Sequence, residues 1–309
     1  MISDLVFVAQ IAVKSSVAVL LASVGEIVAE RSGVLNLGVE GMMLVGALAA
    51  AVTGILTGNP VLAICGGIGA GGLMALIHAV FAVSLRSNQV LSGLALTILG
   101  MGLTSFLGRP FIGKAAVRLK VLPVPGLSEI PVIGPVLFKQ PAMAYVAYLV
   151  VPLTWYLLFR TRLGLKIRAT GEDAASVDTA GISVARIRYG CTLAGGMLAG
   201  LAGSYLSLSY TPGWKDSMTS GQGWVAIAMV IFATWNPLRA VLGALLFGGL
   251  TALQFYFQAV GMELIPTWLL RMLPYLLTIA VLVLVTAWKK ARFRVGAPAD
   301  LGVPFMREG

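Results

Sequence analysis

Residues 29–41 read Ala29-Glu30-Arg31-Ser32-Gly33-Val34-Leu35-Asn36-Leu37-Gly38-Val39-Glu40-Gly41. Charges and glycines here interrupt what would otherwise be one continuous apolar hairpin between residues 5–24 and 41–56. Glycine permits non-helical backbone, and polar side chains within a bilayer need protein or water as partners. Asn36 and Glu40 are four residues apart and would share one face of a helix. The stretch is therefore either a re-entrant, discontinuous segment or an ordinary cytoplasmic turn.

The composition places the chain in a membrane. Hydrophobic residues make up 58% of the 309 residues and charged residues 11%, and the mean hydropathy is +0.93. A water-soluble domain carries about 25% charged residues, because water must wet its surface. The net charge of +10 does not indicate nucleic-acid binding, since the basic residues lie mostly at the ends of apolar segments.

The apolar stretches predict an all-α integral membrane protein, a polytopic bundle of about nine transmembrane helices with a range of about eight to ten. The whole chain, residues 1–309, is expected to form a single transmembrane domain with a cytoplasmic loop at residues 160–188. The expected spans are Leu5–Val24, Gly41–Leu56, Val61–Leu85, Val90–Leu107, Ala142–Phe159, Tyr189–Leu208, Gly223–Trp235, Ala240–Val260 and Trp268–Trp288.

Basic residues predict the orientation, with the N-terminus outside and the C-terminus in the cytoplasm. Fourteen then lie inside: Arg31, Arg86, Arg160, Arg162, Lys166, Arg168, Arg186, Arg188, Arg239, Lys289, Lys290, Arg292, Arg294 and Arg307. Six lie outside, in a basic connector and one later loop: Arg109, Lys114, Arg118, Lys120, Lys139 and Lys215.

Three further features could carry function. In the cytoplasmic loop, Glu172-Asp173-Ala174 begin a predicted helix that ends at Ala180-Gly181-Ile182, and such a helix suits docking to a soluble partner or forms part of a solvated linker. The segment Gly221–Pro237 holds a helix that looks too short to span alone, flanked by two tryptophans. Lys14 lies inside the first span, where a cation is expected to face the protein interior or to pair with Glu26 or Glu40.

Several classes of protein are disfavoured. The sequence has no Gly-rich loop ending in Lys-Ser/Thr, so this chain is not expected to hydrolyse ATP. His78, Cys65 and Cys191 each lie in apolar segments and are interpreted as packing residues, His78 as a hydrogen-bonded one; no metal site or nucleophile–base pair is evident. Gly67-x-x-x-Gly71 and Gly196-x-x-x-Gly200 predict close helix packing.

Together these motifs resemble the branched-chain amino acid/simple-sugar permease family of ABC importers, over nearly the whole chain. Glu30-Arg31-Ser32-Gly33 and Asn36–Gly41 resemble its nucleoside (guanosine/uridine-type) branch in particular, as do Asn88–Leu96 and Gly223–Ala228. One departure is Asp173-Ala174, where that family would be expected to have Asn-Pro in the coupling loop.

The resemblance implies a permease subunit in the bacterial cytoplasmic (inner) membrane that translocates nucleosides by alternating access. It implies three partners: a sister permease in a heterodimer, a cytoplasmic ABC ATPase that binds ATP and Mg, and an external substrate-binding lipoprotein. The chain itself is expected to hold no cofactor. We assign the translocation pathway to Lys14, Asn36, Glu40, Asn88, Gln89 and Trp224, and coupling to the ATPase to Arg168, Gly171, Glu172, Asp173, Asp178 and Gly181.

Alternatives remain within and beyond the family. A ribose-like sugar or an amino acid could be the solute instead of a nucleoside. A stand-alone secondary transporter should show an internal repeat or paired intramembrane carboxylates, and neither is clear in the sequence. A membrane-embedded enzyme would need a catalytic cluster.

The predicted orientation can be tested by labelling. Single cysteines replacing Ser3 and Ser176, in a background without Cys65 and Cys191, should react with an impermeant maleimide from opposite sides of the membrane, because an odd number of crossings separates them. Labelling of both positions from the same side would contradict an odd number.

Overall fold

The computed structural model describes residues 2–259 and 297–306, together with a few isolated positions between these ranges. Seven described helices are long and apolar enough to cross a membrane. They belong to α1 (Ile2–Arg31), α2 (Val39–Thr57), α3 (Pro60–Ala79) with its π-helical extension Val80–Ser84, α4 (Gln89–Leu107), α6 (Ala142–Arg160), α9 (Val184–Tyr205) with its π-helical extension Leu206–Tyr210, and α11 (Pro237–Ala259). The chain is thus a polytopic helical membrane protein. The expected span Trp268–Trp288 lies outside the described residues except at a few isolated positions.

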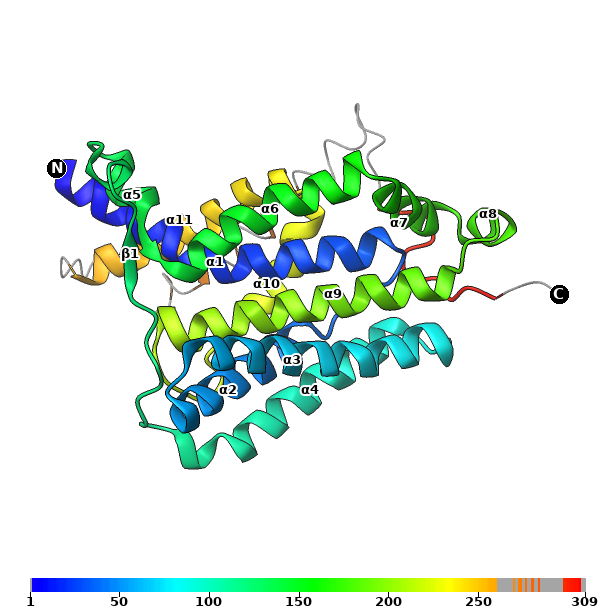
Figure 1. The fold of residues 1–309 in the computed structure, drawn as a ribbon, viewed down its shortest axis with the longest axis horizontal. Coiled ribbons are helices and arrows are strands. Elements are labelled where there is room, and N and C mark those ends of the chain that lie inside the picture. Colours follow the sequence, from blue (N-terminus) through cyan, green and yellow to red (C-terminus); the bar gives the residue numbers. More distant parts are fainter. Residues whose placement is uncertain are drawn as a thin grey trace.

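The helices form two groups on either side of α9 (Figure 1). Helix α1 packs against α9, α11 and α10 (Gln222–Phe232), whereas α2 packs against α3, α9 and α4. Helices α1 and α2 are consecutive in sequence but scarcely touch each other. The link between them therefore has to cross the bundle instead of closing a simple hairpin.

Small residues explain how closely these helices approach. A Cβ atom added to Gly71 on α3 would lie 2.3 Å from the carbonyl oxygen of Gly196 on α9, and one on Gly46 of α2 would lie 2.5 Å from the Cα atom of Gly200. Lipid supplies no hydrophobic drive for helix association, so close backbone contact of this kind holds the helices together. The predicted packing role of both glycine spacings is confirmed.

The two ends of the bundle differ. At one end the connector 109–141 carries a 3-10 turn (Arg109–Phe111), strand β1 (Val121–Pro123), a second 3-10 turn (Leu127–Glu129), α5 (Ile133–Phe138) and strand β2 (Lys139–Pro141). The strands are antiparallel, with Leu122 opposite Gln140. At the other end lie α7 (Arg162–Glu172), α8 (Ala174–Thr179) and residues 297–306, opposite the start of α1 (Figure 1).

Several predicted boundaries need correction. The first span does not end at Val24, because Gly25 packs against Gly195 of α9 and lets α1 continue to Arg31. The loop at residues 160–188, expected to be cytoplasmic, holds two helices in place of one, with the break at Asp173. Glu172 is the last residue of α7, and the next helix begins at Ala174 because the Asp173 side chain accepts a hydrogen bond from the Ser176 N–H and caps it.

The helix contact at Gly71 can be tested against a neighbour on the same helix. Gly71→Ala should destabilise the detergent-solubilised protein by roughly 1–3 kcal/mol, because its Cβ would overlap backbone that cannot move aside. Gly69→Ala is the matched control, since its Cβ would meet nothing within 4 Å. The measurement is the apparent unfolding midpoint of each variant, and equal midpoints would contradict the packing described.

Candidate functional site

The link between α1 and α2, residues 32–38, is non-helical although it is almost entirely buried. Its backbone is paired by side chains from three helices. Gln89 on α4 accepts from the Leu35 N–H at 2.8 Å, and His78 Nε2 lies 3.0 Å from the Leu35 carbonyl oxygen. Glu26 on α1 accepts from the Asn36 N–H at 3.0 Å. Non-helical backbone is tolerated inside a membrane protein only where such partners exist.

Helix α2 begins halfway along its neighbour. A Cβ atom on Gly41 would lie 2.6 Å from the carbonyl oxygen of Leu96, in the middle of α4. Just before the helix, the Asn36 side-chain oxygen accepts from the Gly38 N–H at 2.9 Å, and Thr97 donates to the Leu37 carbonyl at 2.9 Å. Residues 32–38 therefore return from the end of α1 into the bundle, and α2 starts there.

A second broken element meets α2 at this point. Helix α10 has 11 residues and a length of about 16 Å, half of a hydrocarbon core about 30 Å thick. The Glu40 carboxylate accepts hydrogen bonds from the Thr219 hydroxyl at 2.5 Å and from the N–H groups of Gly221 and Gly223 at 2.9 and 2.6 Å. The negative charge thus lies at the N-terminus of α10, where the helix dipole favours it.

The other end of α10 is fixed to the end of α1. The Trp235 indole N–H donates to the buried Glu30 carboxylate, and Arg31 donates to the Trp235 carbonyl oxygen at 3.1 Å. Ser23, further back on α1, donates to the Ala226 carbonyl at 3.1 Å. Helix α10 therefore runs from the bundle interior at Glu40 to the end where α7 and α8 lie.

Lys14 lies in a separate group of polar and aromatic side chains. Its ammonium is 5.7 Å from the centre of the Tyr210 ring, and its carbonyl oxygen accepts from the Tyr205 hydroxyl at 2.7 Å. The Tyr210 hydroxyl lies 3.2 Å from that of Ser15. Twelve residues separate Lys14 from Glu26, which is about 18 Å along a helix, so pairing of Lys14 with Glu26 is wrong. Glu40 is already occupied by its three donors from Thr219, Gly221 and Gly223.

The structure brings together only some of the residues assigned to the pathway. Asn36, Glu40 and Gln89 all surround the buried link, and Trp224 follows Gly223 at the start of α10 with 37% of its surface exposed. Asn88 instead caps α4 by accepting from the Leu91 N–H at 3.1 Å. Glu26, His78 and Thr97 pair the link, and Thr219 pairs Glu40, but none of the four was assigned to the pathway in the sequence. Glu26 could have been found from its four-residue spacing to Glu30 within an apolar helix.

At the other end, α7 contacts the end of α1 and the start of the link directly. A Cβ atom on Gly171, at the end of α7, would lie 2.4 Å from the Arg31 carbonyl oxygen. Arg168 donates to the Leu158 carbonyl at 3.0 Å and lies over the Phe159 ring. The Ser176 hydroxyl and backbone N–H both donate to the Asp173 carboxylate and lower its pKa. Gly181, at a φ of +77°, ends this region.

A groove lies between α7 and α8. It has a volume of about 640 Å³ and is lined mainly by apolar atoms, including those of Leu165, Val177 and Ile182. Lys166 and Glu172 stand at its edges. Among the residues that the structure describes, no three His, Cys, Asp or Glu side chains gather as metal ligands would. The site therefore offers a binding surface and a buried broken-helix junction.

Broken helices that meet inside a polytopic bundle are typical of transport proteins. The chain matches the model of the family described as branched-chain amino acid transport system / permease component over residues 7–282. It belongs to that family. The family's members named below are permease subunits of ABC transporters, and the family description makes the chain a permease component of a transport system.

Three relatives whose names state a solute are similar to the chain over most of its length. A putative glucose ABC transporter permease of Haloferax volcanii is 45% identical over 258 residues, which cover 82% of this chain and 78% of the relative. A nucleoside ABC transporter permease of Lactococcus lactis is 36% identical over 281 residues, 87% and 89% of the two chains. A guanosine ABC transporter permease of Bacillus subtilis is 34% identical over 303 residues, 93% and 92%. No solved structure is significantly similar to the chain.

The role of Glu40 as the cap of α10 predicts a stability loss on neutralisation. Glu40→Gln places an amide donor against N–H groups of α10, and loss of these bonds to a buried charge should cost roughly 1–3 kcal/mol. The apparent unfolding midpoint should fall accordingly. Glu129→Gln, at an exposed position of the connector, should leave it unchanged. A Glu40→Gln protein as stable as the native one would contradict the capping role.

Proposed function

We propose that this chain is one permease of an ATP-driven importer that moves nucleosides across the cytoplasmic membrane of a bacterium. The observation that carries the mechanism is the junction at Glu40, where α2 and α10 both begin inside the bundle. Half-helix termini near the middle of a membrane are typical of solute pathways in transporters. The choice of nucleosides is supported by two relatives named for nucleoside and guanosine transport.

We propose nine crossings, with the N-terminus outside. The seven long helices together with the 211–235 segment, which holds α10, would make eight crossings among the described residues, and residues 268–288 the ninth. Nine of the basic residues assigned to the cytoplasm lie near α7, α8 or the ends of α1, α3, α6 and α10: Arg31, Arg86, Arg160, Arg162, Lys166, Arg168, Arg186, Arg188 and Arg239. This asymmetry supports a cytoplasmic position for that end.

The partners we propose follow from the family and the two ends of the bundle. A cytoplasmic ATPase carrying ATP and Mg would dock on α7 and α8, with an apolar side chain in the groove beside Val177. Movement there would reach the buried link because Gly171 touches Arg31. A sister permease would complete the pathway, and an external binding lipoprotein would deliver the solute to the opposite end.

A simple sugar is the second candidate solute. The relative named as a putative glucose permease is 45% identical, more than the two nucleoside-named relatives. A nucleoside contains a sugar ring, so the two candidates share hydroxyl groups and differ in the planar base.

Transport by the complete reconstituted complex distinguishes the candidates. Proteoliposomes holding both permeases, the ATPase and the binding protein should accumulate labelled guanosine or uridine only when ATP and Mg are supplied on the ATPase side. Glucose and ribose at tenfold excess should leave that uptake unchanged. Uptake of glucose or ribose without nucleoside would overturn the nucleoside assignment while leaving the permease assignment intact.

A further inference from the structure

The segment 297–306 returns to the bundle beside the link between α1 and α2. It makes two backbone hydrogen bonds there: the Asp300 N–H donates to the Gly171 carbonyl at 2.8 Å, and the Gly302 N–H donates to the Gly33 carbonyl at 3.0 Å. Gly171 lies in the last turn of α7, and Gly33 lies in the buried link. Two residues of the tail, Asp300 and Gly302, therefore connect the cytoplasmic helices to the start of the broken segment.

Side chains add two further connections. The Asp300 carboxylate accepts from the Ala174 N–H at 2.8 Å, at the first residue of α8. Arg188 on α9 is 1% exposed and donates to the Val303 carbonyl at 2.9 Å. A Cβ atom on Gly33 would lie 2.9 Å from Nη2 of the same Arg188. The arginine is thus held between the tail and the link.

Apolar contacts anchor both halves of the tail. Leu301 packs against the buried cluster that contains Ile167 and Trp235. Phe305 packs against Ala174 and Val177 of α8 and Val184 of α9. These contacts attach the tail to α7, to α8 and to the membrane helix α9.

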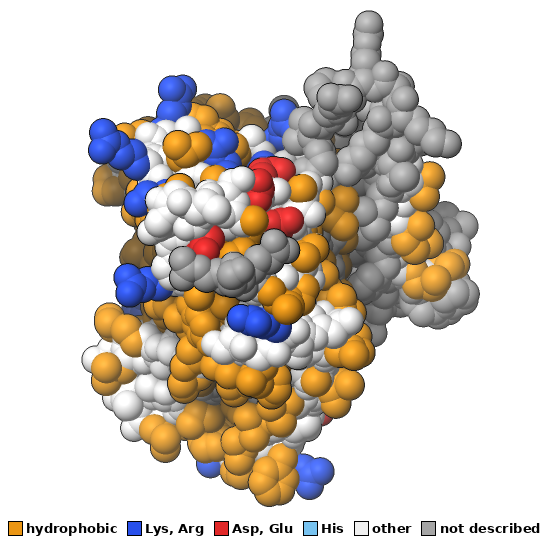
Figure 2. Space-filling model, turned by 90° about the vertical axis from the view of Figure 1, so that its right-hand side faces the viewer, with side chains coloured by type: hydrophobic (Ala, Val, Ile, Leu, Met, Phe, Trp, Pro, Cys, Tyr) orange, Lys and Arg blue, Asp and Glu red, His pale blue; other side chains and the backbone are white. Residues whose placement is uncertain are grey.

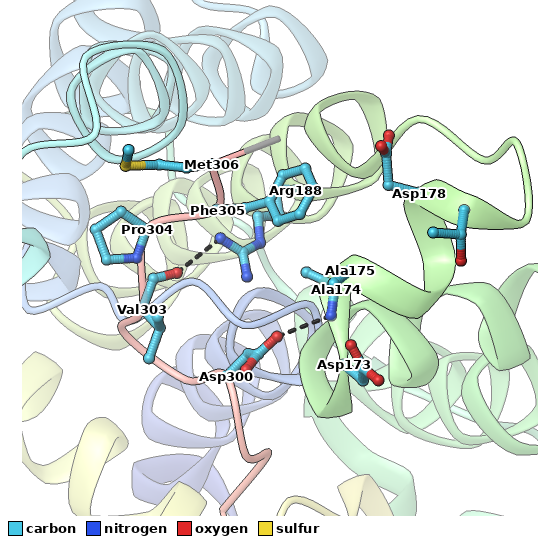
Figure 3. A pocket seen from close by; sticks show the side chains of 11 residues that line it. Asp173, Ala174, Ala175, Asp178, Arg188, Asp300, Val303, Pro304, Phe305 and Met306 are labelled. Carbon is cyan, nitrogen blue, oxygen red and sulfur yellow. Dashed lines mark hydrogen bonds between the residues drawn. The ribbon is translucent and has the colours of Figure 1, made fainter. Parts of the chain in front are cut away.

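The tail and α8 enclose a cavity of about 680 Å³, shown in Figure 3. Asp300 and Arg188 lie on its inner side, with Asp173 and Asp178 on the side of α8. Figure 2 shows the surface of this end, where acidic side chains gather near the middle and basic side chains are spread around them. Across this cavity the tail joins α8 to the bundle, in addition to the direct packing of Ala174 and Val177 against Val184 of α9.

We propose that residues 297–306 act as a strap that transmits movement of the α7–α8 helices to the link between α1 and α2, with Asp300 as its positioning residue. This inference rests on the proposed function, since it assigns a route by which an ATPase acts on the pathway. When α8 moves, it pulls on Asp300, because the Asp300 carboxylate is bonded to the Ala174 N–H. The backbone N–H groups of Asp300 and Gly302 are bonded to Gly171 and Gly33, so the movement reaches α7 and the link. The strap thereby makes α8 and the link move together.

Asp300→Ala in the complete complex tests the strap through the ratio of solute transported to ATP hydrolysed. Solute-stimulated ATP hydrolysis should stay within about twofold of the native rate, while transport per ATP should fall by about tenfold, the factor that 1.4 kcal/mol of lost coupling represents. Asp300→Asn keeps an oxygen acceptor for Ala174 and should restore most of the ratio. Val303→Ala is the matched control, because only its backbone carbonyl binds Arg188.

A labelling experiment on the purified permease tests the docking of the tail independently of transport. In a background without Cys65 and Cys191, Leu301→Cys should react slowly with maleimide, and adding Asp300→Ala should raise the rate severalfold. If the native complex transports no nucleoside, the proposed solute is wrong. The labelling result is independent of that outcome, because it measures only whether the tail is docked. The strap is overturned if Asp300→Ala leaves transport per ATP unchanged, or if transport, hydrolysis and inserted protein all fall in proportion.

Discussion

The pairing of the backbone between residues 32 and 38 is the constraint on which the rest of the structure depends. A non-helical segment inside a membrane bundle leaves N–H and C=O groups that lipid cannot satisfy, and each costs several kcal/mol if unpaired. Glu26, His78, Gln89 and Thr97 supply partners from three different helices. These side chains fix α1, α3 and α4 relative to the link. They are polar because the backbone requires it, whether or not a solute ever touches them.

The same requirement explains why α10 is short. Its first N–H groups are inside the bundle, and Glu40 on α2 accepts from two of them. A single carboxylate therefore lies in the first turn of one broken helix and at the N-terminus of another. Trp235, just after α10, binds Glu30 and Arg31, so α10 connects the end of α1 to Glu40. The geometry joins the end that carries α7 and α8 to the interior of the bundle by a rigid element.

Much of this was predictable from the sequence. Apolar stretches of about 20 residues predicted seven of the long helices, because lipid enforces both helicity and length. Gly33, Asn36 and Glu40 marked the broken segment, since charges and glycine are out of place in an uninterrupted span. The predicted brevity of the segment around Trp224 also agrees with α10. These signals are local, so one sequence is enough to read them.

Contacts between distant segments could not be predicted in the same way. The residues around Glu40 do not indicate that Thr219 is its partner, and those around Gly171 do not indicate Asp300. These hydrogen bonds join residues 129 or more positions apart, so they depend on how the helices cross. Glu172 was placed at a helix start because acidic residues favour that position, but the adjacent Asp173 is the better cap since its shorter side chain reaches the Ser176 N–H. Lys14 was expected to face the protein interior or to pair with Glu26 or Glu40, and its ammonium lies over the Tyr210 ring.

Hydrogen exchange of the backbone amides between residues 32 and 38 tests this account most directly. The N–H groups of Leu35, Asn36 and Gly38 should exchange as slowly as those in the middle of α2, although no helix contains them, because each donates to a buried side chain. The exposed connector residues 113–115 provide the fast reference within the same sample. Exchange of the 32–38 amides at the rate of that connector would contradict the buried, side-chain-paired link and with it the junction at Glu40.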